Sequence, residues 1–242
     1  MNTQEDFRIE FYNKYFSTFK IFINEDLKSE YAYFKRKYLP LIKIHDKNVA
    51  IIDIGCGSGR ILKYLKLSGF QNLYGIDISE EQIRLTREKG FTADVFNVFD
   101  FLETSKKKFD IIFALDIIEH FHKYELIKLF SGFFNLLNKN GFLIIHTPNG
   151  EGVFSQHAIY GDLTHLTIFN PNSLNQILQI TGFKKNKFFE TGPVPKNIKG
   201  FFRFILWNMF KLIIKSIRIV ETGGTEKILT QDFICLAQKE IL

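Results

Sequence analysis

Residues 51–60 combine an acidic side chain with three alternate glycines, and this pattern predicts a binding loop for a small cofactor. The segment reads Ile-Ile-Asp-Ile-Gly-Cys-Gly-Ser-Gly-Arg, so a strand-like apolar run leads into Gly55, Gly57 and Gly59. Glycine at such positions lets the backbone turn sharply and approach a ligand closely, because it tolerates positive φ and carries no Cβ. The chemistry of the loop therefore depends on which cofactor it holds.

The neighbouring residues favour a cofactor that carries an amino acid and a ribose. A dinucleotide fingerprint places its third glycine where this chain has Arg60. Asp53, just before the turn, would repel a pyrophosphate but attract an ammonium group. A second strand-like run, 72–79, contains Asp77 at its end, where a carboxylate can accept both hydroxyls of a ribose.

These segments together resemble class I S-adenosylmethionine-dependent methyltransferases. The glycine loop is 53–59, the ribose-binding step is 76–77, and 109–120 is similar to the strand and loop beneath the methionine part of the cofactor. The resemblance covers roughly residues 31–239. It implies S-adenosylmethionine as cofactor and the following cofactor-binding residues: Asp53, Gly55, Cys56, Gly57, Gly59, Asp77, Ile78, Asn97, Val98 and Leu115. Asn97, with Asp100 as a near alternative, stands where the family often has an acidic acceptor for the adenine amino group.

Looser motifs indicate the acceptor class. Segments 160–169, 174–183, 221–223 and 228–231 resemble small methyltransferases of bacterial surface-polysaccharide pathways. The resemblance implies a small molecule, a nucleotide-linked sugar or a glycan precursor as acceptor, with O-methylation favoured over N-methylation in capsule or other surface-polysaccharide biosynthesis. The Asn/Asp-Pro-Pro-aromatic step of base-modifying amino-methyltransferases is missing after the fourth expected strand.

A hydroxyl acceptor needs a base, and histidine is the usual one. Two segments carry the candidates: His120 follows the fourth expected strand, and His165 lies three residues after Asp162. Asp162 can orient the His165 imidazole, or it can simply form a turn. Alternatively, His120 can simply pack against the cofactor or cap a helix. The sequence thus predicts His165, His120 and Asp162 as catalytic candidates, without deciding among them.

Composition sets limits on partners and location. The 242 residues carry a net charge of +6, but the cations are scattered, so nucleic acid is not expected as a partner. Two cysteines and the absence of an apolar stretch in residues 1–10 favour a reducing, cytoplasmic setting. The remaining histidines, among them His146, show no partner cluster, and no His/Cys spacing suggests zinc. We therefore predict no metal.

The order of expected elements predicts a doubly wound α/β fold. Strands are expected at 50–54, 73–76, 92–96, 110–115, 141–147, 184–190 and 231–238, with helices at 7–22, 30–39, 60–68, 80–89, 123–137 and 173–179. The resemblance implies a mostly parallel seven-stranded sheet whose last strand is antiparallel and lies between its two predecessors. We expect one domain, 1–242, with N-terminal helices in 1–48 and a helical insertion at about 195–227.

Within this insertion, residues 199–219 form an unusually apolar expected helix. Its cations are predicted to share one stripe and to face solvent or an anionic substrate: Lys199, Arg203, Lys211, Lys215 and Arg218. Such a helix must be covered. A lid on the substrate pocket, a homodimer contact and a peripheral membrane contact are all open, and the exit from the ligand side of the sheet favours lid or dimer. A different function also stays open, a catalytically inactive cofactor-binding subunit that docks a partner or a membrane through this helix.

Overall fold

The computed structural model describes Arg8, Phe11, residues 26–42 and residues 44–240. Apart from Arg8 and Phe11, the helix expected at 7–22 lies outside the described residues. The expected second helix is present as α3 (Leu27–Lys37), which Asp26 caps by accepting a hydrogen bond from the Ser29 backbone N–H. A short 3₁₀ turn, η2 (Leu39–Leu41), follows it.

A seven-stranded sheet forms the centre of the molecule, in the order β3-β2-β1-β4-β5-β7-β6. The strands are β1 (Ile51–Ile54), β2 (Leu73–Asp77), β3 (Ala93–Val95), β4 (Phe109–Leu115), β5 (Leu137–Pro148), β6 (Lys185–Glu190) and β7 (Asp232–Gln238). Neighbouring strands from β3 to β5 are parallel, whereas β7 runs antiparallel to both β5 and β6. The expected sheet, including the position of its last strand, is confirmed.

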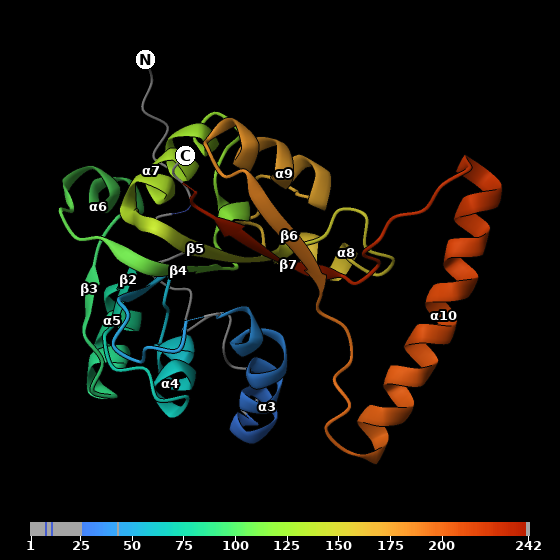
Figure 1. Cartoon of the computed structure of the whole chain (residues 1–242), viewed down its shortest axis with the longest axis horizontal. Coiled ribbons are helices and arrows are strands. Elements are labelled where there is room, and N and C mark those ends of the chain that lie inside the picture. Colours follow the sequence, from blue (N-terminus) through green and yellow to red (C-terminus); the bar gives the residue numbers. More distant parts are fainter. Residues whose placement is uncertain (1–7, 9–10, 12–25, 43, 241–242) are drawn as a thin grey trace.

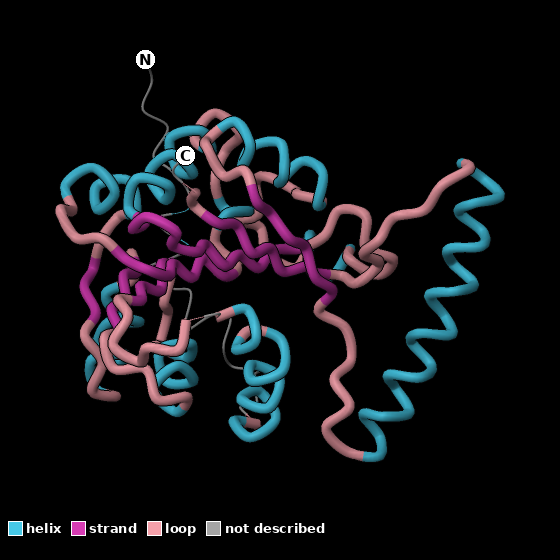
Figure 2. Tube along the Cα trace, viewed as in Figure 1, coloured by secondary structure: helices cyan, strands magenta, loops and turns pink. Residues whose placement is uncertain are grey.

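Helices cover both faces of this sheet (Figure 1). On one face lie α3, α4 (Arg60–Leu67) and α5 (Glu80–Glu88); on the other lie α6 (Val98–Thr104), α7 (Leu126–Leu136) and α9 (Pro171–Ile180). Figure 2 shows the same three layers by element type. Successive strand residues serve opposite layers: Ile51 packs in the cluster with Phe34, while Ile52 packs in the cluster with Phe130.

Two short helices were not expected. Asn97, read from the sequence as part of a loop, caps α6 by accepting a hydrogen bond from the Phe99 backbone N–H at 2.9 Å. The five-residue α8 (Gln156–Tyr160) lies in the long connection after β5. Both helices are too short to show a helical repeat of apolar residues, so the sequence pattern does not predict them.

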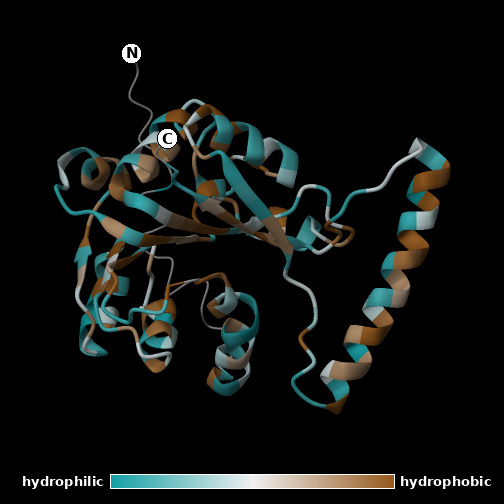
Figure 3. Ribbon diagram, in the orientation of Figure 1, coloured by the Kyte–Doolittle hydropathy of each residue, from teal (hydrophilic) through white to brown (hydrophobic). Residues whose placement is uncertain are grey.

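The predicted helix in the insertion is confirmed as α10 (Ile198–Thr222), and it stands apart from both helical layers (Figure 1). Bands of apolar residues run along it (Figure 3). The prediction that its cations face solvent or an anionic substrate is wrong for Lys211, whose side chain is 17% exposed and pairs with Glu190, whereas Arg218 is 38% exposed and pairs with Glu226. Within the described part of the chain, no helix is long and apolar enough to cross a membrane.

Candidate active site

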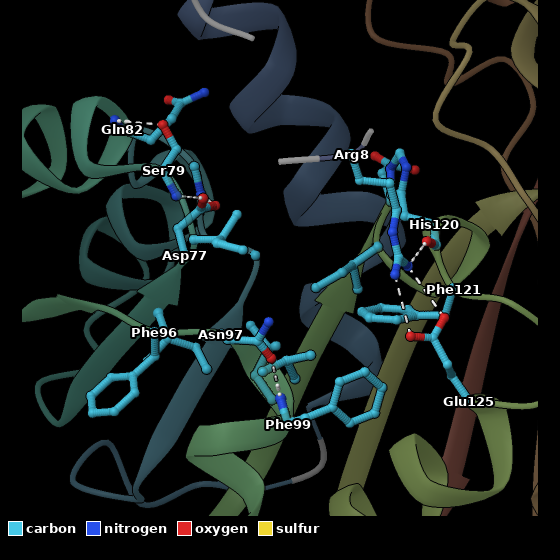
Figure 4. Close-up of a pocket in the computed structure, with 18 residues that line it drawn as sticks. Arg8, Asp77, Ser79, Gln82, Phe96, Asn97, Phe99, His120, Phe121 and Glu125 are labelled. Carbon is cyan, nitrogen blue, oxygen red and sulfur yellow. Dashed lines mark hydrogen bonds and ion pairs between the residues drawn. The ribbon is translucent and has the colours of Figure 1, made fainter. Parts of the chain in front are cut away.

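A cavity of about 370 Å³ lies at the carboxyl ends of β1, β2 and β4, the side of an open parallel sheet that binds ligands. Six of the predicted cofactor residues line it: Gly55, Gly57, Asp77, Ile78, Asn97 and Val98. Figure 4 shows Asp77 and Ser79 on one wall and His120, Phe121 and Glu125 opposite. Four predicted residues do not line it: Asp53, Cys56, Gly59 and Leu115.

The glycine loop has the backbone that its sequence predicts. Gly55, Gly57 and Gly59 have φ values of 75°, 51° and 76°, in the region that favours glycine. A Cβ at Gly55 would lie 2.9 Å from Cδ1 of Ile117, so this position also needs the missing side chain. The loop therefore brings its bare backbone to the cavity wall.

Asp77 fixes the shape of this loop. Its Oδ2 accepts a hydrogen bond from the Gly57 N–H at 2.8 Å, and its Oδ1 accepts one from the Ser79 N–H at 2.9 Å. Burial raises the pKa of Asp77, although these backbone hydrogen bonds act in the opposite direction. Each carboxylate oxygen keeps a second lone pair, so Asp77 can hold the loop and still accept from two ligand hydroxyls.

Asp53 lies beneath the loop rather than on the cavity wall. The side chain is buried, and its Oδ2 has no hydrogen-bond partner among the described residues. Burial, together with the charge of Asp77, raises the pKa of Asp53 to about 8. An uncompensated buried carboxyl of this kind ionises when a cation approaches, which agrees with the predicted role beside an ammonium group.

The far end of the cavity is formed by Phe96, Asn97 and Phe99 (Figure 4). Asn97 Oδ1 is already used in the α6 cap, so its second lone pair and its NH₂ group are what remain for an adenine. Asp100, the alternative acceptor, does not line the cavity. The two phenylalanines give this end the apolar walls that a planar base requires.

The opposite wall carries a chain of hydrogen bonds that fixes the His120 ring. Thr164 has one hydroxyl proton, which it donates to Asp162 Oδ1 at 2.6 Å. The Thr164 hydroxyl oxygen, 2.9 Å from His120 Nδ1, and the Thr164 carbonyl, 3.2 Å from it, can then only accept. Nδ1 must therefore carry the proton, which leaves Nε2 as the basic nitrogen of the neutral ring.

Burial favours the neutral form of His120, although the nearby Asp162 acts in the opposite direction. Burial lowers the pKa of His120, and the neighbouring His165 ring, with its centroid 4.9 Å away, lowers it further. Burial acts to raise the pKa of Asp162, but the hydrogen bonds from Thr164 outweigh it, so the pKa is lowered. Asp162 is thus an anion that orients His120 through Thr164, whereas the sequence paired it with His165.

His165 lies behind His120 and faces Glu119. Its Nδ1 donates to the Ile159 carbonyl at 2.9 Å, and its Nε2 lies 3.9 Å from Glu119 Oε1. Burial raises the pKa of Glu119 to about 8, and the nearby Asp116 charge adds to the shift. Glu119, His120 and His165 each place one ligand atom within 4.8 Å of the others. Without a bound cation, a carboxyl with this pKa is mostly protonated at neutral pH.

Sequence reasoning missed an ion pair at the cavity edge. His146 Nδ1 lies 2.5 Å from Oδ1 of Asp116, a residue that lines the cavity. Burial alone would lower the pKa of His146, but the charge and hydrogen bond of Asp116 outweigh it and raise the pKa to about 9. The expectation that His146 lacks a partner is wrong, because parallel pairing places Leu115 opposite His146 and so brings Asp116 to it.

Arg8 also was not expected at this site. Its guanidinium donates to the His120 carbonyl at 2.8 Å and pairs with Glu125, and it lies 5.9 Å from the centre of the Phe121 ring. Arg8 lines the cavity opposite the glycine loop (Figure 4). A single arginine in a polar N-terminal segment gives no local signal of such a contact.

A model of the methyltransferase domain family matches residues 23–187. The chain belongs to this family. An example among curated relatives is the ubiquinone biosynthesis O-methyltransferase of Pelagibacter ubique (strain HTCC1062), which is 31% identical over 107 residues. That match covers 43% of this chain, and the chain spans only 43% of the relative's length.

Solved structures agree with the family assignment. An S-adenosylmethionine-dependent methyltransferase from Archaeoglobus fulgidus is 25% identical, with a TM-score of 0.65 over 88% of this chain and 94% of that one. Phosphoethanolamine N-methyltransferase 2 of Haemonchus contortus, in complex with S-adenosylmethionine, shares the fold at 16% identity, with a TM-score of 0.60 over 96% of this chain and 56% of that one. The methyltransferase fold and its cofactor, S-adenosylmethionine, are confirmed.

The insertion does not close this methyltransferase site. Among the described residues that line the cavity, none comes from α10. The prediction of a lid is therefore wrong for this structure. The reason is that the inner side of α10 is held by Glu190 at the end of β6, away from the glycine loop.

Proposed function

We propose that this chain transfers a methyl group from S-adenosylmethionine to a hydroxyl group of a small molecule, with His120 as the general base. The observation that carries the proposal is the ordered chain from Asp162 through Thr164 to His120, on the wall opposite the glycine loop. It supplies a neutral imidazole of fixed tautomer with a lowered pKa, as a base at neutral pH requires.

The cavity residues fit the cofactor. Asp77 has lone pairs for the ribose hydroxyls, and Asn97 lies at the adenine end. The Asp53 carboxyl, whose Oδ2 has no hydrogen-bond partner among the described residues, complements an ammonium group. When bound, the cofactor supplies an electrophilic methyl group on a sulfonium. The chain's part is to align the acceptor about 3 to 3.5 Å from that methyl carbon and to take the hydroxyl proton on His120 Nε2.

His165 has a supporting role in this proposal. Its distance to Glu119 and its hydrogen bond to Ile159 give it no direct place on the cavity wall. Its ring instead lies against His120 and helps to keep that ring neutral. We therefore place the two sequence candidates in order, with His120 as the base and His165 as its neighbour.

For the acceptor, we propose a small molecule of the kind expected from the sequence, a nucleotide-linked sugar or glycan precursor of a surface polysaccharide. The motifs in 160–169 and 174–183 support this class. The ubiquinone biosynthesis O-methyltransferase supports oxygen as the methylated atom and offers a second class, precursors of ubiquinone. We also keep the proposal that residues 1–242 form one domain with an insertion at about 195–227.

The test is a product assay on the purified chain. S-adenosylhomocysteine is measured while nucleotide sugars, glycan precursors and ubiquinone precursors are supplied one class at a time. A product with a new O-methyl group from one class, lost in His120→Ala but with cofactor binding retained, supports the proposal. Tight cofactor binding without turnover on every class would instead favour the inactive cofactor-binding subunit.

A further inference from the structure

The helix α10 turns two opposite sides toward different surroundings. Four residues at intervals of seven, four and seven form the inner line: Gly200, Trp207, Lys211 and Arg218. Gly200 is buried, Lys211 pairs with Glu190 at 2.5 Å, and Arg218 pairs with Glu226 at 2.6 Å. This line holds the helix against the rest of the protein.

The outer line has the same spacing, shifted by two residues, which places it about 200° around the helix. It consists of Phe202, Met209, Ile213 and Val220, which are 59%, 58%, 58% and 88% exposed. Further large apolar side chains flank it and are also exposed, among them Leu206, Leu212 and Ile217. A continuous apolar strip of this length on an isolated chain marks an interaction surface.

The charges beside the strip identify what covers it. From 196 to 218 the chain has six cations and no acidic residue: Lys196, Lys199, Arg203, Lys211, Lys215 and Arg218. Lys199 and Arg203, at one edge of the strip, form no ion pair with the described residues. A second copy of the chain would bring the same cations to this edge, and the one acid of α10, Glu221, is already paired with Arg218.

A membrane with anionic lipids matches both the apolar strip and the cations beside it. Acyl chains can take the apolar strip, and lipid phosphates can pair with the flanking cations. The 25-residue helix presents its strip along its whole length, and it is not apolar enough to span a bilayer. We propose that α10 lies in the interface of a membrane rich in anionic lipids, with Phe202, Met209, Ile213 and Val220 toward the acyl chains.

Sedimentation with lipid vesicles tests this proposal on the full chain. Vesicles of phosphatidylcholine alone and vesicles that also contain phosphatidylglycerol are compared at low and at high salt. We expect binding that needs phosphatidylglycerol and weakens with salt. Lys199→Gln and Arg203→Gln should each weaken it about fivefold. Phe202→Ser with Met209→Ser should abolish it.

The matched control replaces the same number of cations elsewhere. Lys106 and Lys139 are exposed and lie near the starts of β4 and β5, at the end of the sheet away from α10. Lys106→Gln with Lys139→Gln should leave vesicle binding unchanged. Circular dichroism and calorimetry with S-adenosylmethionine confirm that each variant is folded. These readouts are independent of the methyl acceptor, so the membrane proposal can fail while the proposed function stands.

Two results would overturn the inference. One is that wild-type protein stays in the supernatant with phosphatidylglycerol vesicles. The same holds if the Lys199→Gln, Arg203→Gln and Phe202→Ser/Met209→Ser variants bind these vesicles as tightly as wild type does. The other is a dimer by light scattering that Phe202→Ser with Met209→Ser converts to a monomer, without any vesicle binding. In that case a second copy covers the strip.

Discussion

Thr164 Oγ1 lies 2.9 Å from Nδ1 of His120, although 44 residues separate them in the chain. Because the single hydroxyl proton of Thr164 goes to Asp162, this contact determines which nitrogen of the His120 ring carries hydrogen. The relationship resembles the way a buried carboxylate orients a catalytic imidazole in hydrolases, with a hydroxyl inserted between the two. Its value for catalysis can be measured separately from cofactor binding.

We predict that Thr164→Val lowers kcat by at least about tenfold, because Nδ1 loses its side-chain acceptor and the ring can adopt the other tautomer. Thr164→Ser keeps the hydroxyl and should restore most of the rate. A steady-state pH profile separates this role from a structural one, since the acidic limb, where His120 becomes protonated, should move in the valine variant. Equal rates and profiles in both variants would show that the hydroxyl does not orient His120.

Asp77 is predicted to support cofactor binding in two ways: it holds the glycine loop in shape, and it accepts hydrogen bonds from the cofactor. Asp77→Ala removes the acceptor of the Gly57 and Ser79 N–H groups as well as the acceptor of the ribose hydroxyls. Each hydrogen bond to a charged group is worth about 1.5 to 3 kcal/mol, so affinity for S-adenosylmethionine should fall at least roughly tenfold. Calorimetry measures this, with Asp100→Ala, which lies outside the cavity wall, as the control.

Gly55→Ala should damage the site more than an alanine elsewhere. The positive φ of Gly55 costs a residue with a Cβ about 1 to 2 kcal/mol, and the new methyl group would press on Ile117. We expect lower stability to urea and weaker cofactor binding. Gly224→Ala is the matched control, because nothing lies within 4 Å of a Cβ there. A Gly55→Ala protein that binds cofactor as wild type does would contradict the close approach.

The Asp116–His146 pair predicts how stability depends on pH. The pKa of His146 rises from 6.5 to about 9 on folding, so its contribution is complete below about pH 6.5 and is lost as pH rises through 9. The pKa of Asp116 is lowered, mainly by the His146 charge against the effect of burial, so its contribution is lost at acid pH. Thermal unfolding of wild type and His146→Gln should differ most near neutrality and converge above pH 9. A constant difference across this range would rule out the charged pair.

The cofactor half of the site was predictable because its determinants are local. Gly55, Gly57 and Asp77 lie at the ends of strands whose order follows from the alternation of β and α segments. The glycine pattern predicts the backbone of the loop without knowledge of any distant contact. The continuous apolar run around Ile51 and Ile52, both of which are buried, likewise indicates a strand covered on both faces.

The acceptor half was only partly predictable, because its contacts depend on long-range pairing. His120 and Asp162 were both candidates, but only the fold shows that Thr164 joins them. The pairing of Asp116 with His146 follows from the register between β4 and β5, which no local pattern reveals. For α10, the apolar residues predicted a helix. Which side of this helix faces the protein depends on Glu190 and Glu226, which lie outside the helix and pair with its cations.

The contact between Thr191 and Thr230 has a consequence for how this chain can vary. The Thr191 N–H donates to the Thr230 hydroxyl at 3.4 Å, and both hydroxyls donate to the Asp232 carbonyl, so the strand ends on either side of α10 meet. The connection between Thr191 and Thr230 is therefore a loop closed at the edge of the sheet, and much of this loop makes little contact with the core. Since the entropy of closing such a loop grows only slowly with its length, this connection can be shortened, lengthened or exchanged at small cost to the sheet. Residues of the site at the strand ends and residues of the exposed helix α10 can therefore change independently of each other.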